Sequence, residues 1–522
     1  MPAYSPNRRT FLKGMGATIA SATVGGSLLT ACSGNTTQST STSGRTSARP
    51  VRGGSANLAI QDTPVNMDPA QFELYASGQV YQNIFSCLIE VDAHYNYHPN
   101  LATTWSQVSD TVWEFEMVDN AVFQNGEPVT ANDVAYTIQR TKKGAIGPYF
   151  QYFDKTEIIN PHKFRIHLAK PFGPLEATIS YLLSMTNEKA IKSHNPTTTP
   201  IGCGPYQMKQ WVHNSHVTLE RWDKYFKKDR PYLDEVTFTS VGDDTVRLSG
   251  LQTGQFQWIQ GVPPQQVKTL LSSTSINHTP ALPVFPYILF LNCSKPPFSD
   301  RRVRQAVSWA VDRSEIVKLA FFGTAVEATE PVASVNPFYS GVNPYKGGPD
   351  LDKARSLMRQ AGVSNENVVF LAQSEVPLYA AIGQVLKSQL APIGLNLNIH
   401  TLSSAEWFGE FSGLKYGLGV TYESTTVDPA NSYYLDVYSK SPFNWTGCKI
   451  PAIDSALQKF TFEADQKVRK QVYPDLVNTI ATEAPEIFLA IQDQQYWTVP
   501  SLHGAMPLPS LEVRAEDLWR ST

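Results

Sequence analysis

The side chains that could carry out catalysis do not form a recognisable motif in this sequence. Hydrolases with a nucleophile or a zinc ion carry patterns such as G-x-S-x-G, H-E-x-x-H, or S-x-x-K with a later K-T-G, and none of these occurs. The ten histidines are dispersed, and only His213 and His216 lie close together, in the segment HNSH. A pair with this spacing is more often a surface feature than a metal site. We therefore expect a protein that is not an enzyme and needs no cofactor.

The cysteines also lack the spacing of a metal or redox site. Besides Cys32, the chain has Cys87, Cys203, Cys293 and Cys448, without a C-x-x-C pair or a Cys/His cluster. Four cysteines allow three complete pairings. The sequence leaves open which pairing forms, or whether all four remain reduced.

The first 31 residues have the features of an export signal. The segment at 7–13, NRRTFLK, is similar to a twin-arginine motif, and the Gly-, Ala- and Thr-rich run after it is too short and too polar for a stable membrane span. The signal ends in Leu29-Thr30-Ala31-Cys32, which is similar to a lipoprotein signal-peptidase site. We predict that residues 1–31 are removed and that Cys32 carries the lipid, palmitate included. The protein would then be anchored to the outer face of the cell membrane or in the periplasm.

The composition after the signal indicates a tethered globular protein. Residues 32–55 are rich in Ser, Thr and Gly and cannot form a core, so we expect a flexible tether. The whole chain of 522 residues is 17% charged and 42% hydrophobic, which is typical of two or three folded domains. Removal of residues 1–31 takes away three basic and no acidic residues and changes the net charge from −3 to −6. Such a charge does not favour a nucleic-acid partner.

The segment at 296–313, PPFSDRRVRQAVSWAVDR, predicts an amphipathic helix. Ser299 or Asp300 can cap its first turn. Five apolar residues then recur at the spacing of one buried face: Val303, Ala306, Val307, Ala310 and Val311. Three arginines stand near the helix start, where cations oppose the helix dipole. We therefore expect acidic partners elsewhere in the fold to hold them, with a solvated basic patch as the alternative.

This segment resembles the central signature of the family 5 extracellular solute-binding proteins, which serve the ABC importers of peptides and nickel. Other segments resemble the same family in the same order along the chain. They are the strand–turn–helix at 120–140, NAVFQNGEPVTANDVAYTIQR, with Thr130 as its cap, and the turn at 200–206, PIGCGPY. The helix at 349–362, PDLDKARSLMRQAG, continues the pattern. The apolar run at 287–292, YILFLN, predicts a buried strand that crosses between two lobes.

The resemblance implies an α/β fold of the periplasmic-binding-protein type (type II, cluster C), with two lobes and a hinge. We expect residues 56–290 to form the N-terminal lobe, with an extra subdomain at about 80–200, and residues 490–522 to return to it. Residues 291–489 would form the second lobe. The protein would be a monomer that captures an oligopeptide or dipeptide between the lobes and delivers it to the transmembrane subunits of an ABC permease. The alternative ligands in this fold are a nickel chelate, haem, an opine or an oligosaccharide.

The resemblance also places the candidate ligand site in the loop at 416–431, YGLGVTYESTTVDPAN. Peptide-binding members have G-W-x-x-D-x-x-D-P here, and the first acid pairs with the α-ammonium group of the peptide. When Asp428-Pro429 is aligned with this pattern, Tyr422 takes the place of the Trp and Thr425 that of the acid. Glu423 is the nearest carboxylate, and a buried ammonium without such a partner would be costly. Further candidates are three residues after the opening strand, Phe72, Glu73 and Tyr75, and three in the second lobe, Trp407, Asn444 and Trp445.

Overall fold

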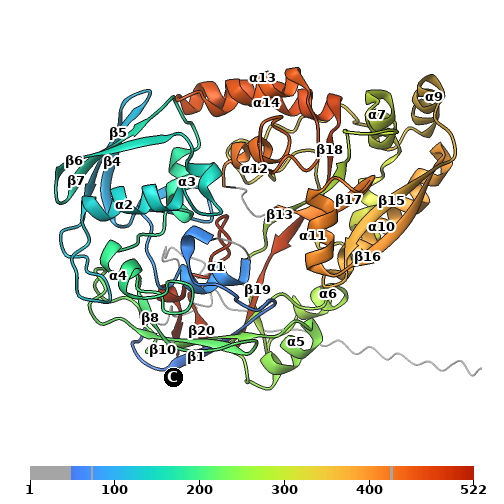
Figure 1. Ribbon diagram of the computed structural model, residues 1–522. Helices are drawn as coiled ribbons and strands as arrows, with labels where there is room; N and C mark the ends of the chain where they lie inside the picture. Colours follow the sequence, from blue (N-terminus) through green and yellow to red (C-terminus); the bar gives the residue numbers. More distant parts are fainter. Residues whose placement is uncertain (1–48, 72–74, 424–426, 522) are drawn as a thin grey trace, which may run out of the picture. The chain divides into compact units, whose positions relative to one another are not determined.

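The computed structural model describes residues 49–71, 75–423 and 427–521, and its three main sheets define the architecture (Figure 1). The first sheet has the order β12-β19-β11-β1-β10-β9-β8, in which β1 (Ser55–Ile60) lies parallel to β10 (Glu235–Ser240) and to β11 (Trp258–Gln260). Its other strands are β8 (Tyr206–Val212), β9 (His216–Arg221), β12 (Asn277–His278) and β19 (Tyr496–Thr498). Because β19 pairs with both β11 and β12, the chain returns to its first sheet near its C-terminus.

The second sheet is a four-stranded antiparallel insertion between β1 and β8. Its order is β4-β5-β7-β6, formed by β4 (Ala102–Ser109), β5 (Val112–Met117), β7 (Lys163–Leu168) and β6 (Phe153–Asn160). Helix α2 (Ala131–Thr141) begins with the predicted capping box, in which Asp133 bonds back to the backbone N–H of Thr130. The other elements of this region are α1 (Tyr75–Tyr81), β2 (Ile89–Val91), β3 (Tyr97–Pro99), α3 (Leu175–Tyr181) and α4 (Glu188–Ser193).

The third sheet has six strands in the order β14-β18-β13-β17-β15-β16 and is covered by helices on both faces (Figure 1). The strands are β13 (Leu282–Leu291), β14 (Ala325–Glu327), β15 (Glu366–Gln373), β16 (Leu395–Leu402), β17 (Leu418–Tyr422) and β18 (Glu486–Gln494). Leu289 of β13 packs into one core and Phe290 into the other, so the strand reads as a continuous apolar run. The predicted buried strand at 287–292 is therefore confirmed as part of the longer β13.

Each face of this sheet has its own set of helices. One core includes residues of α7 (Arg301–Ala310), α8 (Arg313–Leu319), α9 (Leu351–Ala361) and α10 (Pro377–Leu390). The other includes residues of α11 (Ser404–Ser412), α12 (Pro429–Asp436), α13 (Pro451–Thr461) and α14 (Gln466–Glu483). The remaining short elements are α5 (Asp244–Gln252), α6 (Val267–Leu270), β20 (Leu502–His503) and β21 (Trp519–Arg520).

Helix α7 confirms the prediction from the signature segment. Asp300 caps it by accepting from the backbone N–H of Arg302 at 2.8 Å, and the five predicted apolar residues are all buried. An acidic residue from elsewhere in the fold holds two of the arginines, as expected: Arg301 and Arg304 approach Glu483 at 3.3 and 3.7 Å. Arg302 instead pairs with the cap residue Asp300 at 2.6 Å. This helix is therefore docked on the end of α14 through Glu483.

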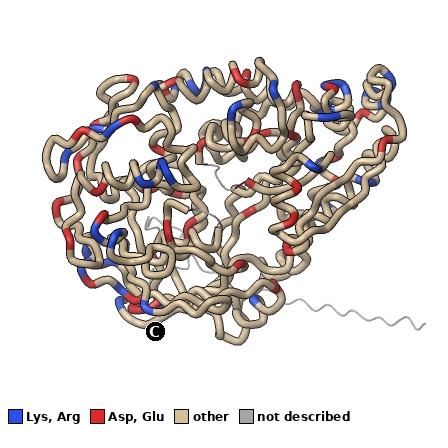
Figure 2. The backbone as a smooth tube through the Cα atoms, in the orientation of Figure 1, with Lys and Arg blue, Asp and Glu red and all other residues tan. Residues whose placement is uncertain are grey.

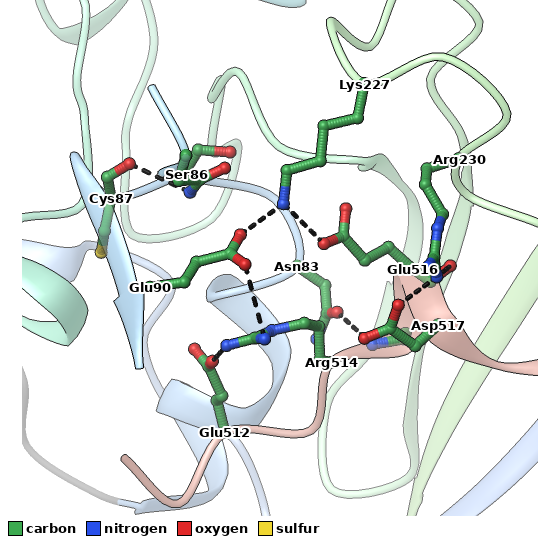
Figure 3. Close-up of polar contacts among 12 residues, drawn as sticks. Asn83, Ser86, Cys87, Glu90, Lys227, Arg230, Glu512, Arg514, Glu516 and Asp517 are labelled. Carbon is green, nitrogen blue, oxygen red and sulfur yellow. Dashed lines mark hydrogen bonds and ion pairs between the residues drawn. The ribbon is translucent and has the colours of Figure 1, made fainter. Parts of the chain in front are cut away.

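A network of charged side chains ties the C-terminal segment to the first part of the fold (Figure 3). Lys227 lies between Glu90 of β2 and Glu516, at 2.9 Å from the latter, and Arg514 approaches Glu90 at 3.4 Å. Burial would raise the pKa of Glu516, but Lys227 and Arg514 lower it below its usual value. Glu516 is therefore held as a carboxylate within the network.

Hydrophobic length, charge distribution and cysteine pairing are the remaining features of the described chain. Within the described ranges, no helix has the length and apolar character needed to cross a membrane. Basic and acidic residues are interspersed along the described chain (Figure 2). The four cysteines whose pairing the sequence left open are free thiols, three of them buried.

Candidate functional site

The junction between the first and third sheets is built on β13 and β18, which pair along their length. Tyr287 donates to Gln492 Oε1 at 2.9 Å, across the two strands. Gln494, near the end of β18, donates through Nε2 to the hydroxyl of Tyr75 at 2.9 Å, while its Oε1 is buried without a hydrogen-bond partner among the described residues. Tyr75, one of the predicted site residues, is thus brought from the first helix to the strands that connect the two halves.

Aromatic rings continue from Tyr75 to the end of β17. The ring of Phe285 meets Tyr75 edge-on at 5.9 Å and Tyr422 edge-on at 5.5 Å, and Tyr422 also packs on Tyr287 at 5.8 Å. Edge-to-face pairs at these distances are favourable beyond the area they bury. Tyr422 and Tyr75, which are 347 positions apart in the sequence, therefore contact the same ring.

Glu423 follows Tyr422 directly and lies in an acid-rich environment. Its backbone N–H donates to Pro286 at 3.0 Å, which fixes the end of β17 against β13. Burial raises the pKa of Asp436 well above its usual value, and the nearby carboxyl groups of Glu423 and Glu486 raise it further. Asp436 is 3% exposed, and its Oδ2 has no hydrogen-bond partner among the described residues. A cationic donor placed here would relieve this repulsion and fill an empty acceptor.

Asp428 has a different role from Glu423. Its two carboxylate oxygens accept from Arg469 at 2.7 and 2.8 Å, and the side chain also caps α12 through the backbone N–H of Ala430. Arg469 is fully buried and Asp428 is 2% exposed. Because three hydrogen bonds within the protein already engage both oxygens of Asp428, we assign it to anchoring the loop and leave it out of the proposed ligand contacts.

Of the three candidates from the second half, Trp407 lies in the core beside β13, Trp445 packs against that core, and Asn444 lies in a turn. Trp407 is 4% exposed and stacks on Phe411 at 4.5 Å, and Trp445 meets the same ring at 5.5 Å. Asn444 closes a tight turn, donating to Cys448 at 2.7 Å and accepting from Thr446 at 2.8 Å. These contacts give each of them a packing or turn role. Phe72, Glu73, Thr425 and the lipidation candidate Cys32 lie outside the described residues.

The sequence of the chain places it in a known family. Residues 96–445 match the family described as bacterial extracellular solute-binding proteins, family 5, middle region. The chain belongs to this family. The recognition made from the signature segment is therefore confirmed, and the two-sided α/β sheet with a connecting strand pair is the fold of this solute-binding protein.

Two relatives of this solute-binding protein are named for the peptides that they bind. It is 23% identical to the glutathione-binding protein GsiB of Pectobacterium atrosepticum over 88% of this chain and 93% of that one. It is 26% identical to the dipeptide-binding protein DppE of Bacillus subtilis, with coverages of 86% and 89%.

Solved structures confirm the predicted fold class. AppA of Bacillus subtilis, an oligopeptide-binding protein solved with a nonapeptide, matches with a TM-score of 0.80 at 20% identity, over 91% of this chain and 100% of that one. AgaA of A. tumefaciens R10, solved with agropinic acid, also gives 0.80 at 21% identity, over 90% and 99%. At such identities the likeness concerns the fold alone.

Two residues near the proposed site were not predicted from the sequence. Gln494 and Asp436 each carry an unfilled acceptor, yet neither stands in a recognisable motif. Gln494 is 419 positions from Tyr75, so no local pattern could have joined them. Within the described part of the chain, no group of three or more His, Cys, Asp or Glu side chains is placed to hold a metal ion.

Proposed function

We propose that this solute-binding protein is the receptor of an ABC importer and captures a short peptide between its two halves. The observation that carries the proposal is the acidic environment at the end of β17, where Glu423 lies near Asp436 and an acceptor of Asp436 is unfilled. The α-ammonium group of a peptide has the charge and the donors that such a place favours. Binding and release, with no chemical conversion, is the activity that follows from membership of the family.

The division of the chain follows the sheets. We propose that residues 56–290, with the insertion at about 80–200 and the return at 490–522, act as one lobe, and that residues 291–489 act as the other. The support is the sheet order, since β19 belongs to the first sheet and β14 to β17 belong to the third. Both boundaries fall within strands of the third sheet, β13 (Leu282–Leu291) and β18 (Glu486–Gln494), which connect the two lobes. Motion of the lobes about β13 and β18 would open and close the ligand site.

The ammonium contact can be tested by a cycle of one protein change and one ligand change. Glu423→Gln should weaken binding of the tripeptide Ala-Ala-Ala by about 10- to 100-fold, because a hydrogen bond to a charged group contributes roughly 1.5–3 kcal/mol. N-acetylation of the peptide removes the charge and should cost the unmodified protein a similar factor. In the Glu423→Gln variant the same acetylation should cost little. If isothermal titration shows that Glu423→Gln and N-acetylation weaken binding independently of each other, Glu423 does not contact the ammonium group.

The peptide assignment itself has a separate test. A thermal-stability screen of the mature protein with di- to pentapeptides, nickel–histidine and oligosaccharides should give shifts for peptides only. Saturation at about 100 times the Kd adds roughly 2.7 kcal/mol of stability. A shift with nickel–histidine and none with any peptide would replace the proposed ligand by the metal chelate.

We also propose that the mature protein is lipid-anchored through Cys32, as a monomer that docks on the transmembrane subunits of its permease. The support is the sequence Leu29-Thr30-Ala31-Cys32 and the tether that follows it. Cys32→Ala should release the exported protein from the membrane fraction and abolish labelling by a palmitate analogue. A variant that stays membrane-bound and labelled would contradict the proposal.

A further inference from the structure

A recess lies at a contact between the two halves that is formed by Tyr152 and by Tyr434 of α12. It has a volume of about 570 Å³, within the range of roughly 300–1,000 Å³ that is common for small-molecule sites. One wall comes from the segment at 142–152, which follows α2, and the other from the segment at 434–442, at the end of α12 and after it. We call it the junction cleft. The residues on which the argument depends are Lys142, Gln151, Tyr152, Tyr434, Tyr438 and Lys440.

The charged residues that line the junction cleft are all basic. Lys142 and Lys440 line it, and no Asp or Glu does. Lys170 lies above the ring of Tyr152, 4.5 Å from its centre, and burial lowers the pKa of this lysine. Within the described residues none of the three forms a salt bridge, since the lysines that do are Lys163, Lys189, Lys192, Lys209, Lys227 and Lys415. In a protein whose mature net charge is −6 and whose charges are otherwise interspersed (Figure 2), this is a local excess of positive charge.

The tyrosines supply an additional hydrogen-bond donor. The hydroxyl groups of Tyr152 and Tyr434 are bonded to each other across the cleft, so one of the two hydrogens remains for another acceptor. Tyr434 stacks on Tyr438 at 4.5 Å and is also hydrogen-bonded to it, so the three hydroxyl groups together keep one hydrogen for an incoming acceptor. Tyr438 accepts from Gln458 at 3.4 Å. Lys142 uses one N–H on the carbonyl of Phe153 at 2.5 Å and keeps two.

A neighbouring cleft extends the basic surface. It has a volume of about 390 Å³, shares Gly144 with the junction cleft, and is lined by Arg140 and Lys143 without an acidic residue. Arg140 is engaged with Asp68, at 2.7 Å for one of its two bonds, so Lys143 is the added cation that an incoming anion could use.

We propose that the junction cleft binds an oxyanion, of the type carried by a phosphorylated or polycarboxylate small molecule or by the phosphate of a lipid headgroup. Lys142 and Lys440 supply the charge from the two sides, the tyrosine hydroxyls supply a neutral donor, and the stacked rings of Tyr434 and Tyr438 offer a flat surface to the remainder of the molecule. Because its two walls come from different halves of the chain, an anion held there also strengthens their contact. The site is separate from Glu423 and does not rest on the peptide assignment.

Isothermal titration with sodium pyrophosphate and with citrate, each against sodium chloride of equal ionic strength, tests the free-anion source. Lys440→Glu should weaken binding by about tenfold or more, since it replaces an attraction by a repulsion, and Lys142→Gln by about threefold. The matched control is Lys318→Glu, an exposed lysine on α8, which should change the affinity by less than about twofold. The affinity for Ala-Ala-Ala should be the same in the Lys440→Glu variant as in the unmodified protein.

Vesicle sedimentation distinguishes the second source. Phosphatidylglycerol vesicles should retain the protein lacking its lipid anchor more strongly than phosphatidylcholine vesicles if the headgroup is the ligand, and Lys440→Glu should abolish the difference. A free anion that binds at low millimolar concentration or better and depends on Lys440 supports the small-molecule source. Absence of binding in both assays, or binding that responds equally to Lys440→Glu and Lys318→Glu, would overturn the proposal.

Discussion

The ion pair between Asp428 and Arg469 offers the sharpest test of how the ligand loop is held. Asp428→Asn keeps the size of the side chain and an oxygen that can cap α12, but it removes the negative charge. Arg469 has no exposed surface, so its charge would be left without a counter-ion in the core. The substitution therefore isolates the contribution of the buried pair from that of the helix cap.

The expected loss can be estimated from the contacts that remain. Breaking a buried ion pair typically costs about 3–5 kcal/mol. Arg469 would keep acceptors in the Phe460 carbonyl at 3.2 Å and Gln466 Oε1 at 3.1 Å, and its guanidinium lies 4.4 Å from the ring centre of Phe460. These partners favour the lower end of the range, so we expect a loss of about 3 kcal/mol in the free energy of unfolding.

Urea denaturation followed by tryptophan fluorescence measures this loss. The matched control is Asp465→Asn, which alters the exposed cap of α14 and should cost less than about 0.5 kcal/mol because asparagine is also a good cap. If Asp428→Asn were no more destabilising than Asp465→Asn, the argument that the pair anchors the loop would be wrong. A loss of peptide affinity without a loss of stability would instead return Asp428 to the ligand contacts.

Two further predictions concern other ionisable groups. Burial raises the pKa of Asp493 in β18 to about 6, from 3.8, so this carboxyl stabilises the fold fully only below pH 3.8, and that contribution is lost as the pH rises through 6. Asp493→Asn should therefore be more stable than the unmodified protein by about 2 kcal/mol at pH 8 and equal to it near pH 4, and a constant difference between the two pH values would contradict this. Lys227→Met should lower the free energy of unfolding in urea by about 2–4 kcal/mol, because it removes the cation between Glu90 and Glu516. The control is Lys228→Met on the exposed neighbour, which should have almost no effect. Equal effects of the two lysine changes would show that the network of Figure 3 does not depend on Lys227.

The helix α7 shows which features could be predicted from the sequence. Its cap, its buried face and the need for acidic partners all follow from spacings of three or four residues, and such spacings are fixed by local hydrogen bonds and by the pitch of the helix. The identity of the acid that holds Arg301 and Arg304 did not follow. Glu483 is about 180 positions away, and only the packing of α14 against α7 brings it there.

The ligand loop also has features that the sequence determined and features that only the tertiary structure decided. The sequence alone determined that this chain belongs among the solute-binding proteins and that an acid is missing at the position of Thr425, because motif residues and their order are visible without coordinates. Only the tertiary structure decided that Asp428 is consumed by Arg469, that Glu423 lies near Asp436, and that Gln494 meets Tyr75. These contacts join residues between 13 and 419 positions apart, and they arise from how whole helices and strands pack, which periodicity within one element cannot specify.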